Sequence, residues 1–211
     1  MEALCGYTRS ELIWYIIMAE FITYSVSRGY KNISDKVKDG TIVNMFLKPM
    51  NFCYYFLAEE SANLLKILIN VVGLLVLGIT YGGILNLSGI GLLFVIISTI
   101  LSIIIGLMMQ LVLGLISFDM EETKSLWFII QKFQFLLVFV PLEFYGAIVQ
   151  KILLFLPTTY LVYAPSRILV KFEFGESLML ILMQIVSIIG LAIISAILYK
   201  RGVKKINANG G

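Results

Sequence analysis

The stretch Ile90–Ile116, which reads IGLLFVIISTILSIIIGLMMQLVLGLI, decides the class of fold to which this chain belongs. It carries no charge and exceeds the roughly 20 apolar residues that an α-helix needs to cross a bilayer. Leu178–Tyr199 is a second run of this kind. Of the 211 residues, 60% are hydrophobic and 14% are charged, against about a quarter charged in soluble domains. The composition therefore predicts an integral membrane protein.

Further apolar segments flank these two runs, although they are shorter or contain charged residues. Leu12–Val26 contains Glu20, and Leu126–Pro141 contains Lys132. Leu64–Thr80 is uncharged apart from one lysine, and another apolar stretch precedes it. Together the segments predict an all-α fold with five membrane-spanning helices. We place a single membrane domain at residues 1–211, with spans at 11–27, 52–80, 89–117, 125–143 and 177–199.

Residues 146–170 form another apolar segment, which is interrupted by Pro157 and Pro165. A proline lacks a backbone N–H and bends or ends a helix. Irregular backbone at membrane depth is tolerated only where protein or water surrounds it. The segment therefore predicts a re-entrant helical hairpin on the outer side, with one broken spanning helix as the alternative.

Basic residues orient the predicted spans, because positively charged loops favour the cytoplasmic side. They gather between the first two spans and after the last one: Arg28, Lys31, Lys36, Lys38 and Lys48, then Lys200, Arg201, Lys204 and Lys205. The segment at 81–89, YGGILNLSG, has no charge and fits the outer side. The pattern predicts that the chain starts outside and ends in the cytoplasm.

Two spans carry polar residues at helical spacing. On the span at 89–117, small or polar residues recur every four positions: Ser98, Ser102, Gly106, Gln110 and Gly114. Small residues let helices approach closely, and polar ones hydrogen-bond between helices, so this face is predicted to pack against neighbours.

On the span at 52–80, Glu59, Asn63, Lys66 and Asn70 follow one another at steps that place them on one helical face. A lysine or an aspartate at a helix centre costs about 2.5–3.5 kcal/mol on insertion scales, so such residues usually face protein or water. Two interpretations remain open. The stripe faces the cytoplasmic mouth or a neighbouring helix, or it lines a translocation path.

Residues 35–56, DKVKDGTIVNMFLKPMNFCYYF, form a charged insert between the first two spans. Apolar or weakly polar residues recur in it at helical spacing: Val37, Thr41, Ile42, Met45 and Phe46. This pattern predicts a short amphipathic helix at the membrane surface, ended by Pro49. The helix is either a connector whose basic residues face lipid headgroups or a docking helix that passes force from a cytosolic partner to the spans.

Four segments resemble, in order and spacing, one family of membrane proteins. They are GYTRSELIWYIIMAEFI at 6–22, DGTIVNMFLKPMNFCYYFLAEE at 39–60, FLPTTYLVYAPSRI at 155–168 and YKRGVKKINANGG at 199–211. The family is that of the ABC type-2 transporter permeases, in its bacterial branch. The resemblance covers essentially the whole chain.

This resemblance implies a half-transporter of the bacterial plasma membrane that pairs with a second permease half, identical or different, and with cytosolic ATP-binding subunits. It implies a coupling helix at about 33–48, with ATPase contacts at Lys36, Lys38, Asp39, Gly40, Lys48 and Pro49. Pro157 and Pro165 would belong to the family's outer re-entrant element. Family members have one more span before the GYT segment, so the chain is expected to lack that first span.

The sequence lacks the motifs of soluble enzymes. It contains no histidine, which excludes Ser-His-Asp and Cys-His catalysis. The two cysteines have no metal-ligand spacing, and no phosphate-binding loop for ATP appears. We therefore expect no cofactor, no metal site and no catalytic residue. The few basic residues follow membrane topology, which argues against a nucleic-acid partner.

These observations predict a permease subunit of an ATP-driven exporter, with ATP hydrolysis on a separate subunit. The alternative is a non-transporting accessory, immunity or degenerate membrane protein. An intramembrane enzyme ranks last, because no nucleophile and base lie together in the predicted spans. The sequence leaves the transported substrate open.

Overall fold

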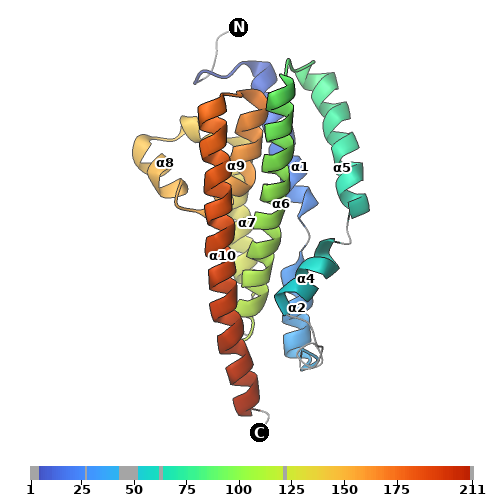
Figure 1. The fold of residues 1–211 in the computed structure, drawn as a ribbon, viewed down its shortest axis with the longest axis vertical. Helices are drawn as coiled ribbons and strands as arrows, with labels where there is room; N and C mark the ends of the chain where they lie inside the picture. Colours follow the sequence, from blue (N-terminus) through green and yellow to red (C-terminus); the bar gives the residue numbers. More distant parts are fainter. Residues whose placement is uncertain (1–4, 27, 43–51, 62–63, 121–122, 210–211) are drawn as a thin grey trace.

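The computed structural model describes residues 5–26, 28–42, 52–61, 64–120 and 123–209, and α-helices dominate these ranges (Figure 1). The α-helices are α1 (Arg9–Ser25), α2 (Gly29–Lys38), α4 (Phe52–Ser61), α5 (Leu64–Leu77), α6 (Gly89–Ile116), α7 (Lys124–Phe139), α8 (Ala147–Leu153), α9 (Pro157–Val170) and α10 (Phe174–Asn209). A π-helical turn, η1 (Gly78–Gly82), follows α5, and a 3₁₀ turn, η2 (Leu142–Phe144), precedes α8. The described part of the chain contains no β-strand, as an all-α fold requires.

Hydroxyl side chains mark where two of these helices begin. Thr8 accepts a hydrogen bond from the backbone N–H of Glu11, and the Glu11 carboxylate accepts one from the N–H of Thr8 at 2.7 Å. This reciprocal capping box satisfies two backbone donors at the start of α1. Ser88 caps α6 with a single hydrogen bond, which it accepts from the N–H of Gly91 at 3.1 Å.

Two of the described helices are long and apolar enough to cross a bilayer: Gly89–Ile116 and Phe174–Lys204. The pair α8–α9 is a third if its two bent halves count as one span. The helices α1, α5 and α7 are shorter, at 17, 14 and 16 residues. The two uncharged runs therefore form helices that are able to cross a membrane, and the five-span arrangement stays a prediction.

The predicted span at 52–80 is divided in the structure between α4 and the α5–η1 unit. Figure 1 shows α4 beside α2 near the lower end, whereas α5 runs along the right-hand edge of the molecule. Glu59 on α4 explains part of this arrangement, because its carboxylate accepts a hydrogen bond from the Asn32 side chain on α2 at 3.1 Å. This contact belongs to the tertiary structure and cannot be deduced from helical spacing.

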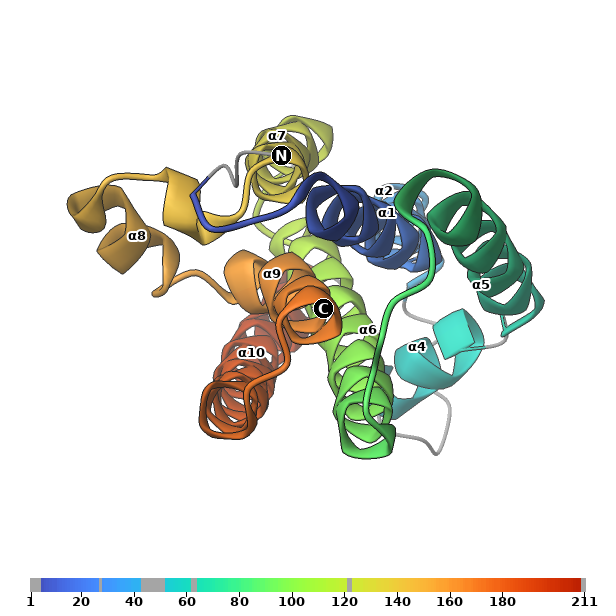
Figure 2. The ribbon, with the colours of Figure 1, turned by 90° about the horizontal axis from the view of Figure 1, so that it is seen from above.

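A polar contact joins the central helices α6, α9 and α10, which lie together in Figure 2. Gln184 on α10 is fully buried, and its amide nitrogen lies 3.0 Å from the Ser98 carbonyl and 2.8 Å from the Ser102 hydroxyl. It also lies 3.1 Å from the carbonyl of Tyr160 on α9, and the Ser98 hydroxyl donates to its amide oxygen at 3.0 Å. The contact satisfies a buried amide that would otherwise be costly.

Close packing along α6 confirms the prediction from its small residues. A Cβ on Gly106 would lie 2.3 Å from a methyl group of Val26, and one on Gly114 would lie 2.4 Å from a methyl group of Ile33. Glycine at these two positions therefore lets α6 contact the end of α1 and the length of α2.

The two ends of the molecule differ in charge. Figure 1 shows the start of the chain and the α9–α10 turn at one end, and α2 and the end of α10 at the other. The second end carries the basic residues of α2 and of the α10 tail, including Lys36, Lys38, Lys200 and Arg201. The predicted topology puts both groups on one side, and the fold agrees with it.

Candidate functional site

Of the predicted coupling helix at 33–48, the structure describes the part up to Ile42, and the helix there begins earlier than expected. The helix α2 spans Gly29–Lys38, and Asp39–Ile42 form turns. Gly40 has φ +69, a left-handed conformation that ends helices and suits glycine. The N–H of Ile42 donates back to the carbonyl of Lys36 at 3.0 Å. Lys48 and Pro49, with the predicted apolar positions Met45 and Phe46, lie outside the described residues.

One face of α2 packs against the rest of the protein. Tyr30 and Ile33 are buried, and the Tyr30 ring stacks on Trp127 of α7 with centroids 5.3 Å apart. The Thr123 hydroxyl, just before α7, donates to the Ser34 hydroxyl at 3.2 Å. Ile33 belongs to an apolar cluster with Phe52, Phe56, Leu111, Leu115 and Phe118. Therefore α2 contacts α4, α6 and α7 together.

The opposite face of α2 is open to solvent. Lys31, Asp35 and Lys38 are exposed, and so are Asp39 and Gly40 in the following turn. Lys36 lies at the edge, with its ammonium 3.7 Å from the Glu59 carboxylate. Therefore α2 is a short helix with one packed face and one charged face.

The predicted polar stripe at Glu59, Asn63, Lys66 and Asn70 is not assembled on a single helix. Glu59 lies on α4 and contacts α2, whereas Asn70 lies on α5. Asn63 lies outside the described residues, as does the side chain of Lys66. The structure therefore does not bring Glu59 and Asn70 together, and Asn70 instead lines a cavity beside Glu20 of α1.

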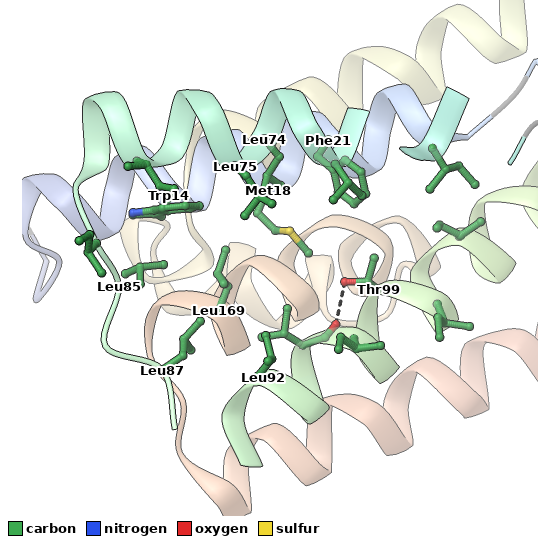
Figure 3. A pocket seen from close by; sticks show the side chains of 18 residues that line it. Trp14, Met18, Phe21, Leu74, Leu75, Leu85, Leu87, Leu92, Thr99 and Leu169 are labelled. Atoms are coloured by element: carbon green, nitrogen blue, oxygen red, sulfur yellow. Dashed lines mark hydrogen bonds between the residues drawn. The ribbon is translucent and has the colours of Figure 1, made fainter. Parts of the chain in front are cut away.

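A larger cavity opens between α1, α5 and α6 (Figure 3). Its volume is about 680 Å³, and Trp14, Met18, Leu74 and Leu92 are among the apolar side chains that line it. The Thr99 hydroxyl in its wall donates to the Val95 carbonyl of its own helix at 2.7 Å. This cavity therefore offers an apolar surface and few polar groups for recognition.

The predicted re-entrant element is a bent helix pair. The axes of α8 and α9 differ by 107°. Pro157 begins α9, a position where its missing N–H is harmless. The Thr159 hydroxyl and the Tyr160 phenol donate to the carbonyls of Leu153 and Leu154, at 2.6 and 2.8 Å, which ties the end of α8 to α9. Pro165 lies inside α9 and does not end it, contrary to the expectation that both prolines interrupt the segment.

An ionic cluster that the sequence analysis missed joins α9, α10 and η2 at the end of the molecule opposite α2. Arg167 on α9 donates two hydrogen bonds to the Glu176 carboxylate of α10, at 2.9 and 3.0 Å. It also lies 3.3 Å from the carboxylate of Glu143 in η2, which accepts a hydrogen bond from the Tyr163 phenol at 2.7 Å. Bidentate pairing of this kind is among the stronger polar contacts in proteins.

The segment before α1 joins this cluster. The Arg167 guanidinium lies 3.2 Å from the Tyr7 phenol oxygen, and the Lys171 ammonium lies over the Tyr7 ring, 4.1 Å from its centroid. Lys171 also donates to the carbonyl of Gly6. Burial raises the pKa of the Tyr7 phenol well above its ordinary value, so Tyr7 stays neutral in the cluster. The sequence signal that could have indicated this ionic cluster was the charged pair Arg167 and Glu176, on either side of the α9–α10 turn.

These features define a helical membrane protein with long apolar helices, a bent helix pair at one end and a docked amphipathic helix at the other. A family model described as "ABC-2 family transporter protein" matches residues 1–210. The chain belongs to this family, as its resemblance predicted, and is a membrane transport subunit. No curated protein and no solved structure matches it.

Proposed function

We propose that the chain is the permease subunit of an ATP-driven exporter in the bacterial plasma membrane. Five spans cross the membrane, built from α1, α4–α5, α6, α7 and α10. The subunit pairs with a second permease half, identical or different, and cytosolic ATP-binding subunits supply the energy. Family membership and the gathering of basic residues at one end of the fold support this proposal.

The packing of α2 on α6 is the observation that gives the proposal its strongest support. The buried face of α2 leaves no free space against α6, since Ile33 lies where a side chain on Gly114 would be. Closely packed surfaces transmit displacement, because they are not continuously deformable. A shift of α2 imposed from the cytosol would therefore move α6, and through Trp127 it would also move α7.

The exposed charges of α2 and its following turn form the ATPase contact in this proposal. Lys36, Lys38 and Asp39 supply the charges, while Gly40 and Pro49 set where the loop bends. At the other end, the bent pair α8–α9 closes the outer side, held by the cluster around Arg167.

Co-purification of the ATPase subunit tests the proposal. Reversing charge at Lys36 and Lys38 to Glu should lower ATPase recovery several-fold, and the loss should be smaller at high salt, because rim charges act through screened electrostatics. The matched control reverses Arg9 and Lys151, two exposed basic residues that lie outside α2 and its following turn. Equal recovery from wild type and both variants would reduce α2 to a surface connector and contradict the coupling role.

A further inference from the structure

A cavity between α1 and α5 differs from the apolar one in Figure 3 because it contains a carboxylate. Its volume is about 460 Å³, within the range of roughly 300–1,000 Å³ that is usual for small-molecule sites. Glu20 of α1 and Asn70 of α5 line it, together with the Phe21 and Tyr24 rings and aliphatic side chains. Such a composition, mostly apolar with few polar groups, is typical of ligand sites.

Glu20 is an acidic residue that forms no ion pair with any residue in the described ranges. It lies within the predicted first span, where an ionised side chain is costly and therefore marks a functional site. Its carboxylate has no hydrogen bond and no ion pair to any residue in the described ranges. Lys132 lines a separate cavity of about 230 Å³ between α1 and α7, to which Glu20 also contributes. The Lys132 ammonium lies over the Phe128 ring, 4.9 Å from its centroid.

The α5 wall of the 460 Å³ cavity, opposite Glu20, supplies an unpaired polar atom and open space. The amide nitrogen of Asn70 is buried and has no hydrogen-bond partner. Gly73, one turn further along α5, also lines the cavity, and a Cβ placed on it would meet no atom within 4 Å. The cavity therefore offers one uncompensated carboxylate, one unpaired amide and two aromatic rings around free volume.

We infer that this cavity binds a lipophilic organic cation, which is the substrate class of the exporter. The identification as substrate rests on the proposed transport function, whereas binding itself does not. A cation neutralises Glu20, and the rings of Phe21 and Tyr24 favour positive charge over their faces. A lipid acyl chain would leave the carboxylate uncompensated, and an organic anion would be repelled by it. The apolar walls match the hydrophobic part of the ligand.

The test measures binding of radiolabelled tetraphenylphosphonium to the purified full chain in lipid nanodiscs. Glu20→Gln removes the charge, and Gly73→Phe fills the free volume without changing charge. Each should weaken binding at least tenfold relative to wild type. Tetraphenylborate, an anion of nearly the same shape, should not compete at the concentration where unlabelled tetraphenylphosphonium does.

Two matched controls separate the site from general effects of substitution. Glu173→Gln neutralises an exposed glutamate outside the predicted spans, and Gly190→Phe adds a ring on α10 where a Cβ meets no atom within 4 Å. Both should bind like wild type. Equal binding by wild type, Glu20→Gln and Gly73→Phe would overturn the inference, because it would indicate partition into lipid. Equal competition by the borate would overturn it as well.

The outcomes distinguish this inference from the proposed function. A protein that retains the ATPase but binds no tetraphenylphosphonium would overturn the cation site and leave the coupling role intact. A protein that binds the cation through Glu20 but never retains an ATPase would keep the site and contradict the exporter.

Discussion

The two sides of α1 are packed in opposite ways. Toward α9, the side chains of Tyr15, Ala19 and Ile22 are fully buried, and the Tyr15 ring lies 6.4 Å from that of Tyr163. Toward α5, Trp14 packs against Gly78 and Gly82 of η1, but α1 also borders cavities of about 680 and 460 Å³. Both cavities open to the outside and are lined partly by exposed apolar side chains such as Ile69 and Leu75, so the α5 side is an open cleft and not a closely packed interface.

Polar groups follow the same division. In the neighbouring group of α6, α9 and α10, the buried amide of Gln184 is hydrogen-bonded to α6 and α9. On the α5 side, the buried amide nitrogen of Asn70 has no partner and Glu20 has no counter-charge. The comparison teaches that α6, α9 and α10 are joined by satisfied polar contacts, whereas the boundary between α1 and α5 contains the cavities and the polar groups without partners.

Adding side chains to glycines on the two sides should give the largest contrast. Gly106→Leu should destabilise the protein by about 3 kcal/mol or more, because its Cβ meets Val26, whose branched side chain has little freedom to move. Gly73→Leu should leave stability unchanged or raise it, since it fills free volume and replaces a poor helix former. Thermal unfolding in one detergent, followed by tryptophan fluorescence, measures both. Equal tolerance of leucine at the two positions would remove the distinction.

The ionic cluster around Arg167 should give the next largest effect. Arg167→Gln leaves the carboxylates of Glu143 and Glu176 without the guanidinium that joins them. Breaking a fully buried pair costs about 3–5 kcal/mol, but both carboxylates are about one-third exposed, so we expect about 2 kcal/mol. The same unfolding assay measures it, with Arg201→Gln in the exposed α10 tail as a neutral control. An unchanged midpoint for Arg167→Gln would show that the cluster is not needed to hold α9 and α10.

Both uncharged spans could be predicted because their signal is local. The run at 90–116 is long, apolar and free of charge. The small residues on one of its faces predict the close packing that is found at Gly106 and Gly114. An amphipathic helix in this region was also predicted, but its start at Gly29 was not. The helix ends at Lys38 because Gly40 adopts a left-handed conformation, and periodicity beyond it suggested a longer helix.

Features that depend on distant parts of the chain could not be predicted. The contact of Arg167 with Tyr7 joins residues 160 positions apart. The segment at 52–80 has the periodicity of one helix, yet Glu59 contacts α2 and Asn70 faces α1. The sequence showed Glu20 as a charged residue within a predicted span, but only the fold shows that α5 forms the other wall of the cavity that Glu20 lines.

A smaller effect is expected where the packed side depends on a polar group. Gln184→Leu preserves most of the volume but removes the amide that bridges α6 and α9. Hydrogen bonds between membrane helices contribute about 0.6 kcal/mol on average, and the full burial of this group suggests about 1 kcal/mol. Ser187→Ala is the matched control, because that hydroxyl bonds only within its own helix, to Met183 at 2.8 Å. A stability above wild type for Gln184→Leu would show that shape, not hydrogen bonding, holds these helices.

The smallest effect on stability is expected at the contact between α2 and α4. Lys36 and Glu59 lie 3.7 Å apart with side chains 27% and 36% exposed, and exposed pairs contribute about 0–1 kcal/mol. Glu59→Gln and Lys36→Met, alone and together, should therefore couple by less than about 0.5 kcal/mol in a double-mutant cycle of unfolding. Lys36→Met should nevertheless lower ATPase recovery while Glu59→Gln does not, because only the lysine belongs to the proposed ATPase contact. A strong coupling in unfolding would instead make α2 and α4 one rigid unit, and a push on α2 would then be carried into α4 as well as into α6.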